Sequence, residues 1–224
     1  ELKDYCEMST TQKMMRAAGF LMLANLISRF LGFIRESLMA GLFGKTAATD
    51  AYNTAFILPD LLYWLLVGGV LSAAFIPVLS EYIAKGQEKE GWKVVSSVTN
   101  LIFLSLCSLI IIAMFLTPKF IALQVPGFSP ENQQLTVYLT RILLLQPVIL
   151  ALSGITMGIL NSYKIFWPSA VGTILYNASI IIFGAIFADS GEAYSISGFA
   201  FGVVIGAAVN FLIQVPFLRR IGIR

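Results

Sequence analysis

Three charged residues, Arg29, Arg35 and Glu36, interrupt an apolar stretch near the start of the chain. That stretch, LISRFLGFIRESLMAGLFG at residues 26–44, is otherwise typical of a helix that faces lipid. A charge at the centre of a bilayer costs about 2.5 to 3.5 kcal/mol on insertion scales, so such side chains usually face a bundle interior or a water-filled cavity. Guanidinium groups keep their proton on burial and bind phosphate oxygens bidentately. Two arginines at mid-membrane therefore suit a diphosphate.

Helical geometry gathers the polar residues of this stretch on one side. At about 100° per residue, a sector of about 60° holds four residues and two more lie just beside it: Asn25, Arg29, Gly32 and Glu36, then Ser28 and Arg35. We expect this sector to face a cavity rather than lipid, and to bind an anion there. An internal ion pair is the alternative, either Arg35 with Glu36 or Arg29 with an acid on another helix.

Two acids and a third arginine also lie within the apolar stretches: Asp50, Asp60 and Arg141. Asp60 follows Pro59, whose missing N–H frees backbone groups, and we expect this deeper acid to offset the first two arginines. Asp50 follows two threonines, so support of a helix start is as good an interpretation as a role in the site. Arg141 lies near an expected outer interface, where snorkelling to lipid headgroups competes with a role in the cavity.

Composition assigns the chain to the polytopic membrane proteins. It is 58% hydrophobic and 12% charged, with a mean hydropathy of +0.83, whereas soluble domains have about 25% charged residues. Histidine is absent and the two cysteines lie far apart, so the sequence offers no His/Cys metal or redox site. Nothing resembles a nucleotide loop, a nucleophile elbow or a catalytic dyad. We therefore predict no enzyme activity, no cofactor and no nucleic-acid partner.

Six apolar stretches are long enough to cross a bilayer as helices, which needs about 20 residues each. They lie at about 14–43, 47–84, 93–118, 132–160, 167–188 and 195–217. We predict an all-α bundle of about six transmembrane helices, joined by loops at 85–93 and 119–131. Pro59 and Pro77 should kink or break the second stretch. Gly198, Gly202 and Gly206 repeat every fourth residue, a pattern that predicts close helix packing.

The basic residues predict the orientation of the bundle. If the N-terminus is cytoplasmic, ten basic residues lie inside and only Lys45 and Lys119 lie outside. The ten are Lys3, Lys13, Arg16, Lys85, Lys89, Lys93, Lys164, Arg219, Arg220 and Arg224. We expect a cytoplasmic tail at 1–12, a six-helix lobe at 13–218 and a basic cytoplasmic end at 219–224.

An ordered set of motifs resembles the first part of the MurJ (MviN) family, from about residue 13 to 224. The motifs are SRFLGFIRE at 28–36, GLFG at 41–44, ATDAY at 48–52, LPDLL at 58–62, LSAAFIPVLSEY at 71–82, VPGF at 125–128 and GILNSYKIFWPSA at 158–170. The resemblance implies a lipid II flippase of the multidrug/oligosaccharidyl-lipid/polysaccharide exporter superfamily, in the bacterial cytoplasmic membrane. Such proteins move undecaprenyl-diphosphate-linked peptidoglycan precursor to the outer leaflet by alternating access of two lobes around a cationic cavity.

The resemblance also implies which residues belong to the substrate-binding site. The family's first-helix arginines correspond to Arg29 and Arg35, and its TDA acid corresponds to Asp50. The implied partners are the lipid-linked precursor, membrane lipids and cell-wall synthesis proteins.

Two departures from the family pattern leave alternatives open. Tyr63 and Trp64 stand where many members have an arginine pair, and six of about fourteen helices amount to the N-terminal lobe alone. An exporter of another polyprenyl-diphosphate-linked saccharide is one alternative. A membrane scaffold for cell-wall enzymes is the other.

The charge bias generates a topology test. A cysteine placed at Ser190 should react with an impermeant thiol reagent added outside the cell, whereas one placed at Gly86 should not. The opposite labelling pattern would reverse the predicted orientation.

Overall fold

The computed structural model describes residues 10–65, 81–82, 85–188 and 192–221, and every regular element in these ranges is a helix. Pro77, Ser190 and most of the N-terminal tail therefore lie outside the described residues. The α-helices are α2 (Thr10–Phe43), α3 (Ala47–Ala55), α4 (Ile57–Tyr63), α6 (Glu88–Gln124), α7 (Pro130–Leu143), α8 (Gln146–Ser162), α9 (Trp167–Phe187), α10 (Ser197–Leu212) and α11 (Val215–Arg220), and η3 (Ala193–Ile196) is a 3-10 helix.

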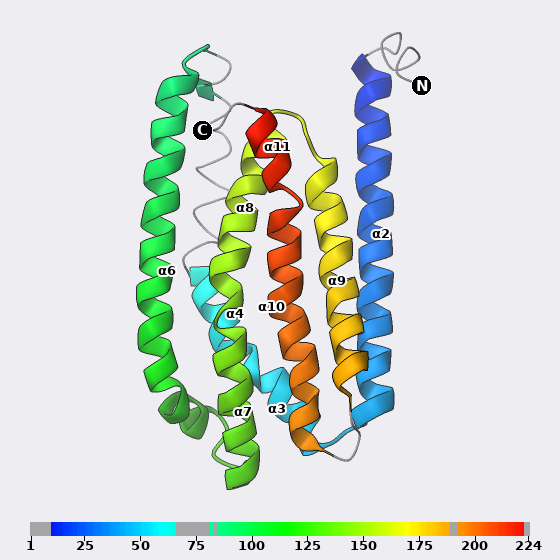
Figure 1. The fold of residues 1–224 in the computed structure, drawn as a ribbon, viewed down its shortest axis with the longest axis vertical. Helices are drawn as coiled ribbons and strands as arrows, with labels where there is room; N and C mark the ends of the chain where they lie inside the picture. Colours follow the sequence, from blue (N-terminus) through cyan, green and yellow to red (C-terminus); the bar gives the residue numbers. More distant parts are fainter. Residues whose placement is uncertain (1–9, 66–80, 83–84, 189–191, 222–224) are drawn as a thin grey trace.

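The helices form an elongated bundle with α6 at one side and α2 at the other (Figure 1). Four segments in the described part are long and apolar enough to cross a membrane: Lys89–Gln124, Pro130–Ser162, Trp167–Phe187 and Tyr194–Arg220. Helix α2 has 34 residues, about 51 Å at 1.5 Å per residue, and runs beside α9. It begins at the end of the bundle where α11 finishes. The predicted all-α membrane bundle is confirmed.

Prolines set the internal breaks of three segments. In each, a helix ends four residues before a proline, at Ala55 before Pro59, Leu143 before Pro147 and Leu212 before Pro216. A proline lacks the N–H that would bond to the carbonyl four residues back, and its ring clashes with that carbonyl. The break predicted at Pro59 is therefore present, between α3 and α4.

A buried glutamine satisfies the backbone at one of these breaks. The N–H of Gln214 donates to the Phe211 carbonyl, which leaves the Asn210 carbonyl without its helical donor. The side-chain Nε2 of Gln214 donates to that carbonyl at 2.9 Å, and to Ser153 Oγ on α8 at 2.8 Å. An unpaired carbonyl would be costly in lipid, so this side chain makes the break between α10 and α11 tolerable.

The loops are shorter than predicted because α6 extends in both directions. It begins at Glu88, inside the expected 85–93 loop, and continues through Pro118 to Gln124. Beyond it, Ser129 caps α7 by accepting from the Asn132 N–H at 3.3 Å, with Pro130 in the first turn. The predicted 119–131 connection is thus reduced to residues 125–129.

The closest helix contact is that of α9 with α10, along the predicted glycine face. A Cβ built on Gly202 would lie 2.7 Å from Ile180 Cα, and one on Gly206 would lie 2.7 Å from the Tyr176 carbonyl oxygen. Gly198 meets the Phe183 carbonyl oxygen at 2.8 Å in the same way. These distances are too short for any side chain, so the packing role predicted for the three glycines is confirmed.

The glycine contact predicts a loss of stability on substitution. Gly202→Leu should separate α9 from α10 and destabilise the bundle by about 1 to 3 kcal/mol or more, as overpacking does. Thermal unfolding in detergent measures the loss. Gly41→Leu is the matched control, because a Cβ on Gly41 meets nothing within 4 Å. Equal melting temperatures for the two variants would contradict the packing role.

Candidate functional site

The predicted polar sector of α2 divides into a packed part and an open part. Asn177 of α9 donates from Nδ2 to Ser28 Oγ at 3.0 Å, and Ser28 Oγ donates to the Thr173 carbonyl at 3.5 Å. A Cβ on Gly32 would lie 3.9 Å from Asn177 Oδ1. Ser28 and Gly32 therefore face α9, where they position α2 against the bundle.

The open part of α2 carries Asn25, Arg29 and Glu36, all of which are exposed. Arg29 makes no hydrogen bond or ion pair with any described residue. Large apolar side chains stand on the same helix, with Phe30 64% and Phe33 68% exposed. This face thus presents one unpaired guanidinium within an apolar surface, an arrangement able to bind an anion that carries apolar groups.

Arg35 is half-buried on α2. Its Nη2 donates to Glu36 Oε1 at 2.6 Å, with side-chain exposures of 27% for Arg35 and 56% for Glu36. The intrahelical ion pair considered above is therefore present. Because Glu36 is exposed on this face, the pair is open to a ligand anion that competes with Glu36 for the guanidinium.

A buried polar group behind Arg35 was missed from the sequence. Gln146 of α8 donates from Nε2 to the Tyr176 hydroxyl of α9 at 3.3 Å. Tyr52 of α3 is 4% exposed, and its hydroxyl has no hydrogen-bond partner among the described residues. Tyr52 and Tyr176 belong to the same packed cluster. The available signal was a set of polar residues within apolar stretches, but only the fold shows that three helices bring them together.

The two acids lie on α3 and α4, and both are exposed. Asp50 stands in the first turn of α3, where the positive end of the helix dipole stabilises a carboxylate. Neither acid forms an ion pair with a described residue. Their roles as counter-charges stay predictions.

The adjacent aromatic residues Tyr63 and Trp64 differ in burial. Tyr63 is half-buried and packs against the cluster around Ile155 and Ile159, whereas Trp64 is 69% exposed. Their rings meet edge to face, with centroids 6.3 Å apart. This position therefore offers an aromatic surface and no positive charge.

Comparisons with known proteins assign the chain to a protein family. Residues 39–224 match the family model described as Lipid II flippase MurJ. A probable lipid II flippase MurJ of Buchnera aphidicola subsp. Acyrthosiphon pisum is 38% identical over 201 residues, which is 89% of this chain and 39% of the relative. A lipid II flippase MurJ of Burkholderia cenocepacia is 28% identical over 216 residues, 96% of this chain and 41% of the relative.

A solved structure agrees with the sequence matches. It is described as lipid II flippase MurJ in an inward closed conformation, and it matches with a TM-score of 0.71 and 31% identity. The match covers 90% of this chain and 41% of that chain. The chain thus spans about two fifths of the length of these proteins. The family-model match begins at residue 39, so the correspondence of Arg29 and Arg35 rests on the SRFLGFIRE motif.

The contact between α2 and α9 predicts a modest loss of stability in Asn177→Leu. The change removes the hydrogen bond to Ser28, and such bonds between membrane helices contribute about 1 kcal/mol. The melting temperature in detergent should fall by about 2 to 4 °C. Asn100→Leu is the control, since Asn100 is exposed on α6. An equal or smaller effect at Asn177 would mean that this bond does not hold α2 in place.

Proposed function

Since the chain belongs to the lipid II flippase MurJ family, we propose that it acts as one lobe of a transporter for a lipid-linked peptidoglycan precursor. The complete protein would carry the undecaprenyl-diphosphate-linked precursor from the inner to the outer leaflet of the bacterial cytoplasmic membrane. Both termini of this segment would lie in the cytoplasm. The transport step breaks no covalent bond, so the residues need only bind and release the substrate.

The observation that carries this proposal is the open face of α2. Arg29 stands there without a protein partner among the described residues, beside exposed Phe30 and Phe33. A diphosphate supplies oxygens that match the planar guanidinium fork. A polyprenyl chain supplies apolar surface for the neighbouring side chains.

Each polar residue of this face has a proposed part in binding. Arg29 holds one phosphate of the substrate from the start. Arg35 leaves Glu36 for the second phosphate, so Glu36 keeps the charge balanced when the cavity is empty. Asn25 lies on the same helix face and donates from its amide. Asp50 and Asp60 lower the net positive charge of the cavity and so favour release.

Alternating access completes the mechanism in the whole protein. The lobe moves as a body, because α9 and α10 are in backbone contact and α2 is hydrogen-bonded to α9. A second lobe facing α2 would close over the substrate from one side and then from the other. Membrane lipids and cell-wall synthesis proteins are the proposed partners.

Tyr63 and Trp64 favour one alternative cargo. An exposed indole such as that of Trp64 can stack on a sugar ring, while the positive charge common at this position in the family is absent. The alternative function is therefore export of a different polyprenyl-diphosphate-linked saccharide by the same mechanism.

The test replaces the two arginines in the full-length protein. Arg29→Lys and Arg35→Lys keep the charge but lose the fork, so each should weaken lipid II binding by about tenfold and impair growth complementation. The alanine variants should be more damaging. Lys45→Ala, an exposed cation outside this face, should bind and complement normally. Parallel titration with another undecaprenyl-diphosphate-linked saccharide separates the two cargoes.

Two results would count against the diphosphate role. Normal binding and growth with both alanine substitutions would remove it altogether. Rescue of Arg35→Glu by Glu36→Arg, with unchanged substrate affinity, would make that ion pair purely structural.

A further inference from the structure

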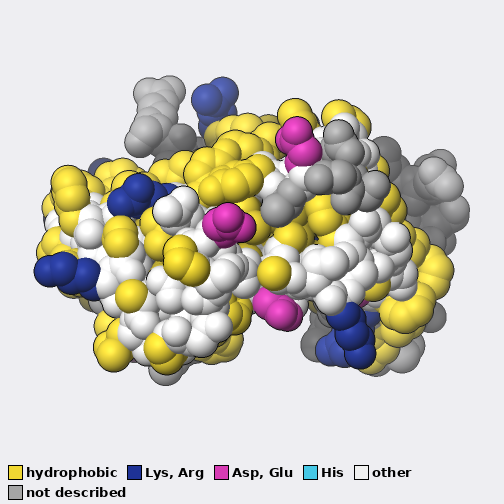
Figure 2. Space-filling view, turned by 90° about the horizontal axis from the view of Figure 1, so that it is seen from below, with side chains coloured by type: hydrophobic (Ala, Val, Ile, Leu, Met, Phe, Trp, Pro, Cys, Tyr) yellow, Lys and Arg dark blue, Asp and Glu magenta, His cyan; other side chains and the backbone are white. Residues whose placement is uncertain are grey.

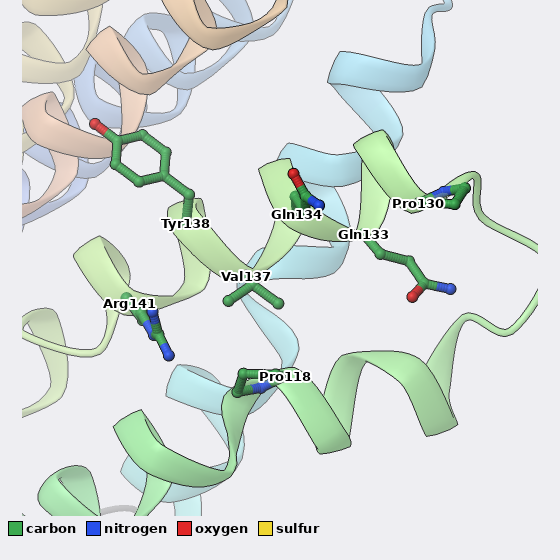
Figure 3. Close-up of a pocket in the computed structure, with 7 residues that line it drawn as sticks. All are labelled: Pro118, Pro130, Gln133, Gln134, Val137, Tyr138 and Arg141. Carbon is green, nitrogen blue, oxygen red and sulfur yellow. The ribbon is translucent and has the colours of Figure 1, made fainter.

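A second candidate site lies between α6 and α7, away from the open face of α2. It is a pocket of about 490 Å³ at the end of the bundle where α7 begins. Its lining residues are Pro118, Pro130, Gln133, Gln134, Val137, Tyr138 and Arg141. Figure 3 shows the side chains of Arg141 and Val137 pointing from α7 toward Pro118 of α6. One cation and an apolar wall therefore share this pocket.

The polar groups of the pocket suit a phosphate and a hydroxyl. Arg141 is exposed and makes no hydrogen bond or ion pair with a described residue, so its guanidinium donors are available. Gln133 donates from Nε2 to the Val125 and Phe128 carbonyls, at 3.3 Å each. Because these bonds occupy its amide donors, Gln133 offers its carbonyl oxygen as an acceptor. Lys119, the residue after Pro118, is exposed but is not among the lining residues.

Apolar surface leads from the pocket along both helices. On α6, Ile111 and Phe115 precede Pro118 by seven and three residues, on one helix face, and are 58% and 80% exposed. Just beyond α7, at the break before α8, Leu145 follows Arg141 by four residues and is 48% exposed. A ligand with its phosphate at Arg141 could therefore lay hydrocarbon chains against this surface.

We propose that this pocket binds an anionic glycerophospholipid of the surrounding membrane, with its phosphate at Arg141 and its acyl chains along α6. Figure 2, viewed from this end of the bundle, shows basic and acidic side chains separated by hydrophobic and uncharged surface. The single guanidinium of the pocket matches a single phosphate monoanion. The free carbonyl of Gln133 matches a headgroup hydroxyl, which favours a phosphoglycerol headgroup.

The bound lipid would have a structural consequence. Pro118 removes one backbone hydrogen bond from α6, although Thr117 Oγ donates to the Ala113 carbonyl nearby at 2.6 Å. A phospholipid bound across Pro118 and Arg141 would hold this part of α6 against α7. It would act independently of the transported substrate.

Native mass spectrometry of the full-length protein tests the site by titration with three lipids: dioleoyl-phosphatidylglycerol, dioleoylglycerol without phosphate, and undecaprenyl diphosphate. Arg141→Ala should weaken phosphatidylglycerol binding by about tenfold, the loss of one charge-assisted contact. Val137→Trp, which fills the pocket without changing charge, should do the same. Lys45→Ala removes a cation at the same end of the bundle and should have no effect.

Three outcomes would overturn the proposal. The first is phosphatidylglycerol binding that both pocket variants leave unchanged, as expected if another part of the protein covers the pocket. The second is equal binding of dioleoylglycerol, which would mean that phosphate is not recognised. The third is a loss of undecaprenyl diphosphate binding in Arg141→Ala with phosphatidylglycerol unaffected, which would assign the pocket to the substrate path.

Discussion

The backbone contact between α9 and α10 determines where the other functional elements lie. Glycines on α10 bring the two helices together without intervening side chains. Tyr176 takes part in this contact through its backbone and in the buried polar group through its hydroxyl. On the same helix, Asn177 turns toward α2 and bonds to Ser28. One helix thus fixes α10 on one side and the arginine-bearing helix on the other.

The sequence predicted the helices well because their signals are strong and local. Long apolar stretches define spans, and Pro59 was expected to interrupt one of them, whereas the breaks before Pro147 and Pro216 lie inside stretches that were predicted as single spans. Pro118 has the same local chemistry but lies inside a continuous α6. A proline removes one hydrogen bond at each of these places, and packing against neighbouring helices decides whether the chain kinks, breaks or continues. Sequence alone does not contain that packing.

The candidate site was predictable as a sector but not as separate roles. Periodicity placed Ser28, Arg29 and Arg35 on nearby sides of one helix, which is correct. Periodicity did not predict that Ser28 contacts α9 or that Arg29 is exposed. It also left open whether Arg35 forms its ion pair with Glu36. These differences depend on a neighbouring helix distant in sequence. The buried group of Tyr52, Gln146 and Tyr176 was missed for the same reason, since it joins three helices.

The ion pair between consecutive residues has an electrical consequence. Arg35 and Glu36 move together with α2, so their opposite charges cancel wherever the helix goes. Arg29 has no such companion among the described residues. If α2 shifts along the membrane normal, Arg29 is the uncompensated charge within the apolar stretch 26–44, while Lys13 and Arg16 add positive charge at the start of the helix. The transmembrane potential is worth about 2.3 kcal/mol per 100 mV for one charge that passes through the whole field, and an anion bound at Arg29 would cancel or reverse the part of the force that acts there.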